Sequence, residues 1–277
     1  MISNDRGSSP DDHQPRYDRA LLLLGRKRND VLTLPEAHAY GTDSFGDPDY
    51  LSLYGMTPAQ WYARGIRLLG RTAVECTKDA LARAVADDIA ALVDLARRRD
   101  VTVVDPFAGS CNTIYWILRT LPRSTGLAFE LDPHVSALTR DNLAKLDRQV
   151  LLSAGNYERL LHECPIPDDH LVVTFVAPPW GDALDAETGL DLRRTSPPIA
   201  EVIATLAGRF TRHQMVYAVQ VYEKVESTSL TEVREMFDWS ELRTYELNAT
   251  GGNHGVVLAT AGWRPGDGPG DGPERAS

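Results

Sequence analysis

The sequence predicts an α/β fold: a seven-stranded, mostly parallel sheet with a C-terminal antiparallel hairpin, preceded by a helical N-terminal extension. Two observations support this. From residue 101 onward, short apolar runs alternate with segments of helical periodicity, which is the pattern of a parallel sheet with covering helices. Near the C-terminus two apolar runs follow one another directly, separated by Gly251-Gly252-Asn253, which suits the positive φ angles of a hairpin turn. We therefore expect one reversed strand in the sheet.

The chain divides into four parts. Residues 1–16 are polar and rich in Pro and Asp, and residues 264–277 repeat a Gly-Asp-Gly-Pro sequence, so we expect both to be disordered tails. Residues 17–76 are expected to form the extension and residues 77–263 the α/β domain.

Helices and strands are expected as follows. In the extension, Thr57-Pro58 is typical of a helix start, and the apolar spacing continues that helix to Leu69. A longer helix is expected after Thr77 as its cap, ending at the basic residues 97–99, which favour a helix C-terminus. The remaining expected strands are 101–105, 125–130, 149–153, 171–176, 214–221, 241–248 and 254–262, with helices at 111–121, 133–146, 197–209 and 229–237.

Composition limits the partners. The 277 residues carry a net charge of −10, and an acidic chain is a poor match for a long nucleic acid, whose phosphates are bound mainly by basic residues. A small-molecule substrate fits better. No run approaches the ~18 apolar residues of a membrane span, the N-terminus lacks the order of a secretory signal, and the 3 cysteines form no metal or disulfide pattern. We expect a cytoplasmic protein with no membrane partner and no metal site.

The first expected strand ends in an acid and leads into a turn of small residues. Asp105 closes the strand, and Phe107-Ala108-Gly109 follows before the next helix. In open α/β sheets ligands bind beyond the carboxyl ends of the strands, and a glycine lets the backbone approach a ligand closely. Only one glycine is present, so the pyrophosphate cradle of dinucleotide-binding proteins is missing. This favours S-adenosylmethionine (SAM) over NAD, although any tight strand-to-helix turn could look similar.

Two later strand ends carry matching polar residues. Glu130 lies 21 residues after Gly109 and could accept hydrogen bonds from both ribose hydroxyls of a nucleoside. Asp132-Pro133 is explained as a helix cap followed by a first-turn proline. Asn156 follows the third strand, where it could contact the adenine amine or belong to an ordinary turn.

The fourth strand ends in Ala177-Pro178-Pro179-Trp180, which we interpret as the substrate end of the site. Carbonyls that precede proline rings can accept hydrogen bonds from an amine, and a tryptophan face can stack on a base for ~1–3 kcal/mol. A core tryptophan is the alternative. Residues 182–194 could form a lid over the substrate, and their acidic side chains could hold a cation or simply be solvated.

These motifs resemble class I SAM-dependent methyltransferases, which have a Rossmann-like sheet. Ala177-Pro178-Pro179-Trp180-Gly181 with 186–193, supported by 65–68, 74–77 and 105–112, resembles more specifically the trimethylguanosine synthase family of RNA-cap guanine-N2 methyltransferases. The resemblance covers roughly residues 60–262. It implies that Trp180 stacks on a guanine-like ring and that the backbone of Ala177 and Pro178 faces the acceptor nitrogen. It further implies cofactor contacts from 74–77, which include Thr77, and from Asn112.

The chain also departs from that family. Ala177 stands where the family has a small polar residue, and Asp182 stands where it has a second glycine. The first motif is also similar to that of DNA amino-methyltransferases, except that Cys111 replaces a glycine.

The sequence thus predicts a SAM-dependent methyltransferase acting on a planar, nitrogen-bearing small molecule stacked on Trp180. The alternatives are an RNA guanine-N2 methyltransferase and a catalytically silent SAM-binding protein. The expected site residues are Ala177, Pro178, Pro179 and Trp180 for catalysis, and Thr77, Asp105, Phe107, Ala108, Gly109, Asn112, Glu130, Asn156 and Ala177 for the cofactor. The methylated atom and the oligomeric state stay open.

Overall fold

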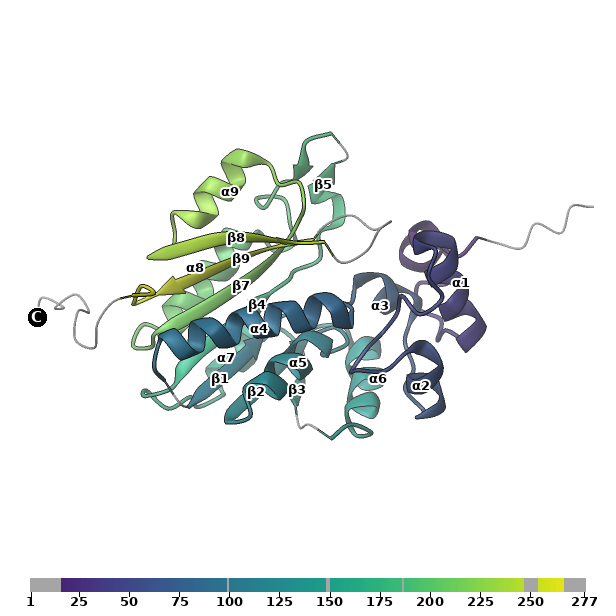
Figure 1. Cartoon of the computed structure of the whole chain (residues 1–277), viewed down its shortest axis with the longest axis horizontal. Helices are drawn as coiled ribbons and strands as arrows, with labels where there is room; N and C mark the ends of the chain where they lie inside the picture. The colour runs from purple at the N-terminus through teal and green to yellow at the C-terminus, as the bar shows by residue number, and fades with distance from the viewer. Residues whose placement is uncertain (1–15, 99, 148–149, 186, 247–253, 267–277) are drawn as a thin grey trace, which may run out of the picture.

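A computed structural model describes residues 16–98, 100–147, 150–185, 187–246 and 254–266 (Figure 1). Of the expected tails at 1–16 and 264–277, residues 1–15 and 267–277 lie outside the described part of the chain, as does the expected 251–253 turn, whereas 264–266 are described. Arg16, assigned to the first tail, is described, and its Nη2 donates to the Asp43 carbonyl at 2.9 Å.

The centre of the molecule is a seven-stranded sheet with the order β3-β2-β1-β4-β7-β9-β8. All neighbouring pairs from β3 to β7 are parallel, whereas β9 is antiparallel to both β7 and β8. The predicted fold class, with its single reversed strand, is therefore confirmed. The strands are β1 (Val101–Asp105), β2 (Ser124–Glu130), β3 (Leu151–Ala154), β4 (Leu171–Val176), β7 (Met215–Tyr222), β8 (Trp239–Tyr245) and β9 (His254–Ala261).

Helices cover both faces of the sheet. One apolar core joins it to α4 (Asp79–Leu95), α5 (Asn112–Thr120) and α6 (Pro133–Leu143). A second core joins the other face to α7 (Tyr157–His162), α8 (Ile199–Arg209) and α9 (Ser227–Arg234). Every residue of β1 and β4 is buried, which explains why these strands are continuous apolar runs rather than alternating ones.

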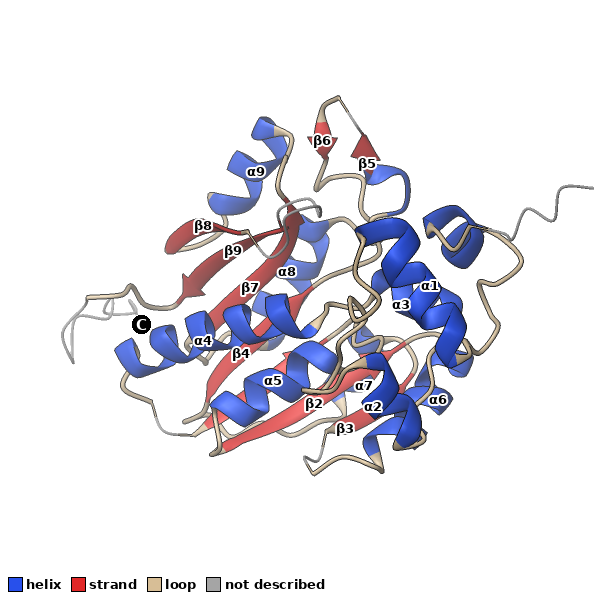
Figure 2. Ribbon diagram, turned by 45° about the vertical axis from the view of Figure 1, so that its right-hand side comes forward, coloured by secondary structure: helices blue, strands red, loops and turns tan. Residues whose placement is uncertain are grey.

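The extension has a core of its own. It contains η1 (Ala20–Leu24), α1 (Leu34–Phe45), α2 (Pro58–Ala63) and α3 (Gly70–Glu75). Trp61 is fully buried at its centre, and its indole Nε1 donates to the Leu51 carbonyl at 2.8 Å. Figures 1 and 2 show these helices gathered beyond the carboxyl ends of the parallel strands. The extension therefore faces the edge at which the expected site residues lie.

The helix expected from Thr57 to Leu69 is wrong beyond Ala63. α2 ends there because Gly65 adopts a φ of +84°, and the chain then runs extended until Leu69 forms a β-bridge with Val31. The apolar residues of this segment are buried in the extension core, but they do not lie on one face of a single helix. The cap of α4 is likewise Lys78 rather than Thr77, whose hydroxyl donates to Gln220 instead.

Other expected elements are found with ends that differ by a few residues. The sequence did not predict α1, α3, α7 or the 3-10 turn η2 (Gly181–Ala183). It also did not predict the two-stranded hairpin of β5 (Leu184–Asp185) and β6 (Gly189–Leu190), which falls inside the expected lid.

Candidate functional site

The expected site residues meet at one edge of the sheet. Asp105 and Glu130 end β1 and β2, and Ala177 follows β4; Tyr222, which the sequence analysis did not single out, ends the neighbouring β7. Because these four strands are parallel neighbours, their carboxyl ends lie side by side. The strand order reverses between β1 and β4, and this switch point is where open α/β sheets bind ligands.

The Gly109 turn is attached to Glu130. The Gly109 amide donates to one carboxylate oxygen at 3.0 Å, and the Asp132 amide donates to the other at 2.8 Å. A carboxylate has about four lone-pair sites, so both oxygens can accept further hydrogen bonds. Burial raises the pKa of Glu130, while these two amides and the nearby Arg71 act in the opposite direction.

Asp105 is more deeply placed than the sequence implied. It is only 2% exposed, and its carboxylate accepts from the Phe107 amide at 3.2 Å. Burial, with a smaller contribution from the charge of Glu130, raises the pKa of Asp105 to about 7. Its side chain therefore supports the turn through the hydrogen bond from the Phe107 amide.

The turn itself leaves room for a ligand. A Cβ placed on Gly109, whose φ is +48°, would meet no heavy atom within 4 Å. Ala108 donates its amide to the Phe129 carbonyl at 2.9 Å, which fixes the turn against β2. Cys111 has a φ of +59°, so this position keeps the left-handed backbone that a glycine would adopt freely.

Asn112 holds the extension. It is 1% exposed; its amide oxygen accepts from the Tyr54 backbone N–H at 2.8 Å, and its Nδ2 donates to the Thr77 carbonyl at 2.8 Å. Both ends of the amide are thus used within the protein, and Asn112 positions Thr77; a cofactor contact by Asn112 stays a prediction. The Thr77 hydroxyl in turn donates to Gln220 of β7 at 2.9 Å.

Asn156, which follows β3, and Phe107, which follows β1, both have structural partners. Asn156 is exposed, and its side chain caps α7 by accepting from the Glu158 amide at 2.7 Å. Phe107 packs edge-on against Tyr157, with ring centroids 5.3 Å apart. A cofactor contact by Asn156 or Phe107 stays a prediction.

Backbone hydrogen bonds hold the Pro-Pro-Trp segment at Pro179 and Trp180. Ser196 donates to the Pro179 carbonyl at 3.2 Å, and Ala183 donates to the Trp180 carbonyl at 2.8 Å. Within the described part of the chain, the carbonyls of Ala177 and Pro178 accept no such backbone hydrogen bond. These are the two carbonyls expected to face an acceptor amine.

Trp180 lies beside a residue that the sequence reasoning missed. Its ring is half-buried and meets Tyr222 edge-to-face, with centroids 6.0 Å apart and planes at 71°. Tyr222, Gln220 and Tyr54 were not among the expected site residues. The position of Tyr222 at the end of an expected strand was the available signal for it.

The segment expected to be a lid is anchored at both sides and exposed at its tip. Leu190 and Leu192 are 0% and 1% exposed and belong to the core under α8. Asp185 accepts from the Glu187 and Thr188 amides, and Asp191 pairs with Arg193 at 2.9 Å. These two acids therefore stabilise the hairpin itself.

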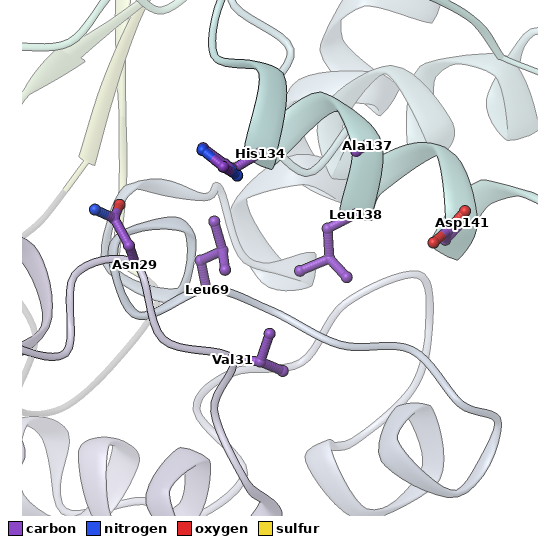
Figure 3. A pocket seen from close by; sticks show the side chains of 7 residues that line it. All are labelled: Asn29, Val31, Leu69, His134, Ala137, Leu138 and Asp141. Atoms are coloured by element: carbon purple, nitrogen blue, oxygen red, sulfur yellow. The ribbon is translucent and has the colours of Figure 1, made fainter.

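A cavity of about 410 Å³ lies beside the site, at the junction of α6 and the extension (Figure 3). His134, Leu138 and Asp141 line it from α6, opposite Val31 and Leu69. None of the expected site residues lines it.

Three solved structures with similar folds were compared with the chain. No family model and no curated protein sequence matches it. The fold is Rossmann-like. It is similar to a METTL16 MTase domain, with a TM-score of 0.47 and 16% identity over 69% of this chain and 72% of that one. It is similar to precorrin-6y C5,15-methyltransferase from Geobacter metallireducens, with a TM-score of 0.46 and 19% identity over 69% of this chain and 90% of that one.

A third similar structure is a probable spermidine synthase from Corynebacterium glutamicum, with a TM-score of 0.46 and 13% identity over 70% of this chain and 68% of that one. Two of the three names describe methyltransferases and the third describes a synthase. Such distant likenesses concern the fold, and the reaction of this chain has to be argued from its own site.

No helix among the described residues is long and apolar enough to cross a membrane. Those residues also contain no cluster of three or more His, Cys, Asp or Glu side chains suited to a metal ion.

Proposed function

We propose that the protein is a SAM-dependent methyltransferase whose acceptor is a planar, nitrogen-bearing small molecule. The observation that carries this proposal is the convergence at the switch point of the sheet. The Gly109 turn and Glu130 lie on one side of it, and Ala177-Pro178-Pro179-Trp180 follows the strand on the other.

The residues around Gly109 suit the cofactor. The open space beyond the Gly109 Cα would admit a ligand close to the backbone, and Glu130 is already fixed at the turn by two amides. Glu130 would accept the ribose hydroxyls, and the 107–109 backbone would approach the rest of the nucleoside. SAM supplies an activated methyl group, so the protein's task is to place the acceptor in line with it.

The acceptor would lie against Trp180. One edge of the tryptophan is braced by Tyr222, which leaves its orientation defined before the acceptor binds. The Ala177 and Pro178 carbonyls would accept hydrogen bonds from the acceptor's amino group and hold its nitrogen toward the cofactor. Proton loss from the product nitrogen can pass to solvent, so the proposal needs no strong base.

Two features support a small acceptor. The chain has a net charge of −10, which does not favour a polymeric phosphate backbone. Ala177 also lacks the side-chain acceptor that the resemblance to guanine-N2 methyltransferases would lead one to expect.

Transfer of labelled methyl from SAM into a host extract, separated into RNA and small-metabolite fractions, tests the proposal. We expect label in the small-metabolite fraction that disappears with Trp180→Ala. Label confined to RNA would overturn the small-molecule acceptor and favour guanine-N2 chemistry. Tight binding of SAM without any transfer would identify a silent SAM-binding protein.

A further inference from the structure

Arg71 is a buried cation that no part of the proposed reaction uses. It lies in the first turn of α3 in the extension, is 9% exposed, and its Nη2 contacts Asp132 Oδ2 at 2.5 Å. Among the described residues, its buried Nε has no hydrogen-bond partner. A buried donor without a partner is costly, and such atoms in native proteins call for an explanation.

The backbone around Arg71 is fixed before any ligand arrives. The Arg71 amide donates to the Arg28 carbonyl at 3.0 Å, and the Gly70 amide donates to the Asp30 carbonyl at 3.0 Å. A Cβ on Gly70 would collide with the Lys27 carbonyl, so only glycine lets α3 approach this segment so closely. The backbone that carries Arg71 is therefore held in place, and the side chain is tied to Asp132 through Nη2.

Arg71 also lies next to the residue expected to bind ribose. Its partner Asp132 donates its own amide to Glu130 Oε1 at 2.8 Å and caps α6 through Oδ1, with the His134 amide at 2.9 Å. Burial raises the pKa of Glu130, and the charge of Arg71 is close enough to oppose part of that rise. A continuous chain of contacts thus runs from α3 through Asp132 to Glu130 and Gly109.

We propose that Arg71 is a cofactor-binding residue, whose Nε–H donates to an oxygen of the nucleoside held by Glu130. A ribose hydroxyl donates one hydrogen bond and accepts others, so an acid and a guanidinium side by side match its chemistry. The inference rests on the proposed function. It gives the extension a direct part in holding the cofactor.

The test is the binding of two ligands, S-adenosylhomocysteine and 5′-methylthioadenosine, measured by titration calorimetry. The second keeps the nucleoside and lacks the amino-acid group. We expect Arg71→Lys to weaken both by about tenfold to a hundredfold, the worth of one charge-assisted hydrogen bond. The matched control Arg212→Lys changes an exposed arginine paired with Asp168 and should leave both affinities unchanged.

The variant Asp132→Asn distinguishes a direct contact between Arg71 and the nucleoside from an indirect role of Arg71 in positioning Asp132. It removes the charge that holds Arg71 but keeps an oxygen to cap α6, and we expect a loss of no more than about threefold. A loss equal to that of Arg71→Lys would overturn the direct contact and leave Arg71 as a support for Asp132. Thermal unfolding without ligand confirms that each variant is folded.

Three further outcomes are decisive. Unchanged binding in Arg71→Lys overturns the inference. Weakening of S-adenosylhomocysteine alone also overturns it, because the contact would then go to the amino-acid carboxylate. Absence of binding by the wild-type protein would instead overturn the proposed function itself, and with it the inference.

Discussion

At the scale of single residues, Glu130 connects the cofactor proposal to the observed geometry. Its two carboxylate oxygens hold the Gly109 and Asp132 amides, and each has capacity left for a hydroxyl. Glu130→Ala removes this acceptor pair as well as the support of the turn. We expect the dissociation constant for S-adenosylhomocysteine to rise at least about a hundredfold, since each charge-assisted bond contributes about 1.5–3 kcal/mol.

Calorimetry with Glu235→Ala, which alters an exposed glutamate after α9, provides the comparison. An unchanged dissociation constant in Glu130→Ala would remove Glu130 from the ribose site.

The proposed function assigns Trp180 to the acceptor and not to the cofactor. Trp180→Ala removes the stacking surface beside Tyr222 but leaves the Gly109 turn untouched. We expect kcat/KM to fall by about tenfold to a hundredfold, the equivalent of ~1–3 kcal/mol of stacking, with cofactor affinity near normal. Steady-state rates with the identified acceptor, together with S-adenosylhomocysteine binding, check this. Equal loss of both would show that Trp180 is structural.

Asp105 should make the stability of the protein depend on pH. Burial raises its pKa to about 7, well above the ~3.9 of an unfolded chain. The folded protein therefore keeps this proton where the unfolded chain has lost it. The resulting stabilisation is full below about pH 4 and is lost as pH rises through about 7.

Asp105→Asn removes that dependence because an amide cannot ionise. Between pH 5 and pH 8, we expect urea unfolding to show a gain in the stability of the variant relative to wild type of about 3 kcal/mol. The exposed Asp168→Asn serves as control. If the free energies of unfolding of variant and wild type differed by the same amount at both pH values, Asp105 would not be a buried carboxyl that is protonated at pH 5.

At the scale of elements, the β5–β6 hairpin is attached by close backbone contact. Gly189 has a φ of +89°, and a Cβ there would collide with the Lys224 carbonyl. Leu190 donates to the same carbonyl at 2.9 Å, so the hairpin depends on this approach. We expect Gly189→Ala to displace the hairpin, at a cost of about 1–3 kcal/mol, and to lower turnover while sparing cofactor binding.

Gly208→Ala is the matched control. It lies within α8 with no heavy atom within 4 Å of an added Cβ, so it should stabilise the protein by about 0.5–1 kcal/mol. Denaturant unfolding and initial rates distinguish the two variants. Full activity in Gly189→Ala would separate the hairpin from the acceptor site.

At the scale of the whole molecule, two buried asparagines fasten the extension to the α/β domain. Asn112 of α5 binds the Tyr54 and Thr77 backbone, and Asn142 of α6 binds both backbone groups of Arg67, at 3.0 and 2.7 Å. Each is 1% exposed. The extension is thus part of the folded unit and covers the carboxyl edge of the sheet.

Asn112→Ala and Asn142→Ala form a matched pair. Each leaves one buried backbone donor and one acceptor without partners, and we expect each to cost about 2–4 kcal/mol in the free energy of unfolding. Only Asn112→Ala should also weaken S-adenosylhomocysteine binding, because Asn112 positions Thr77 beside the site. Urea unfolding with calorimetry measures both effects. Equal loss of affinity in the two variants would mean that the position of Thr77 has no specific effect on cofactor binding.

Some features of this protein were determined by the sequence alone. The alternation of strands and helices after residue 101 could be predicted because it depends on local periodicity. The grouping of the acids and the Pro-Pro-Trp segment could be predicted because parallel strands have their carboxyl ends at one edge of the sheet. The strands at 101–105 and 171–176 were therefore predicted with their observed ends.

Other features were decided only by tertiary structure. Leu68 and Leu69 followed a helical spacing, yet the packing of Leu69 beside Val31 made that segment extended. The partners of Asn112, which are the Tyr54 and Thr77 backbones, left no signal in the sequence, and Arg71 carried no motif at all. Contacts between residues distant in sequence leave no local pattern, so burial and partner choice emerge only when the extension packs onto the sheet.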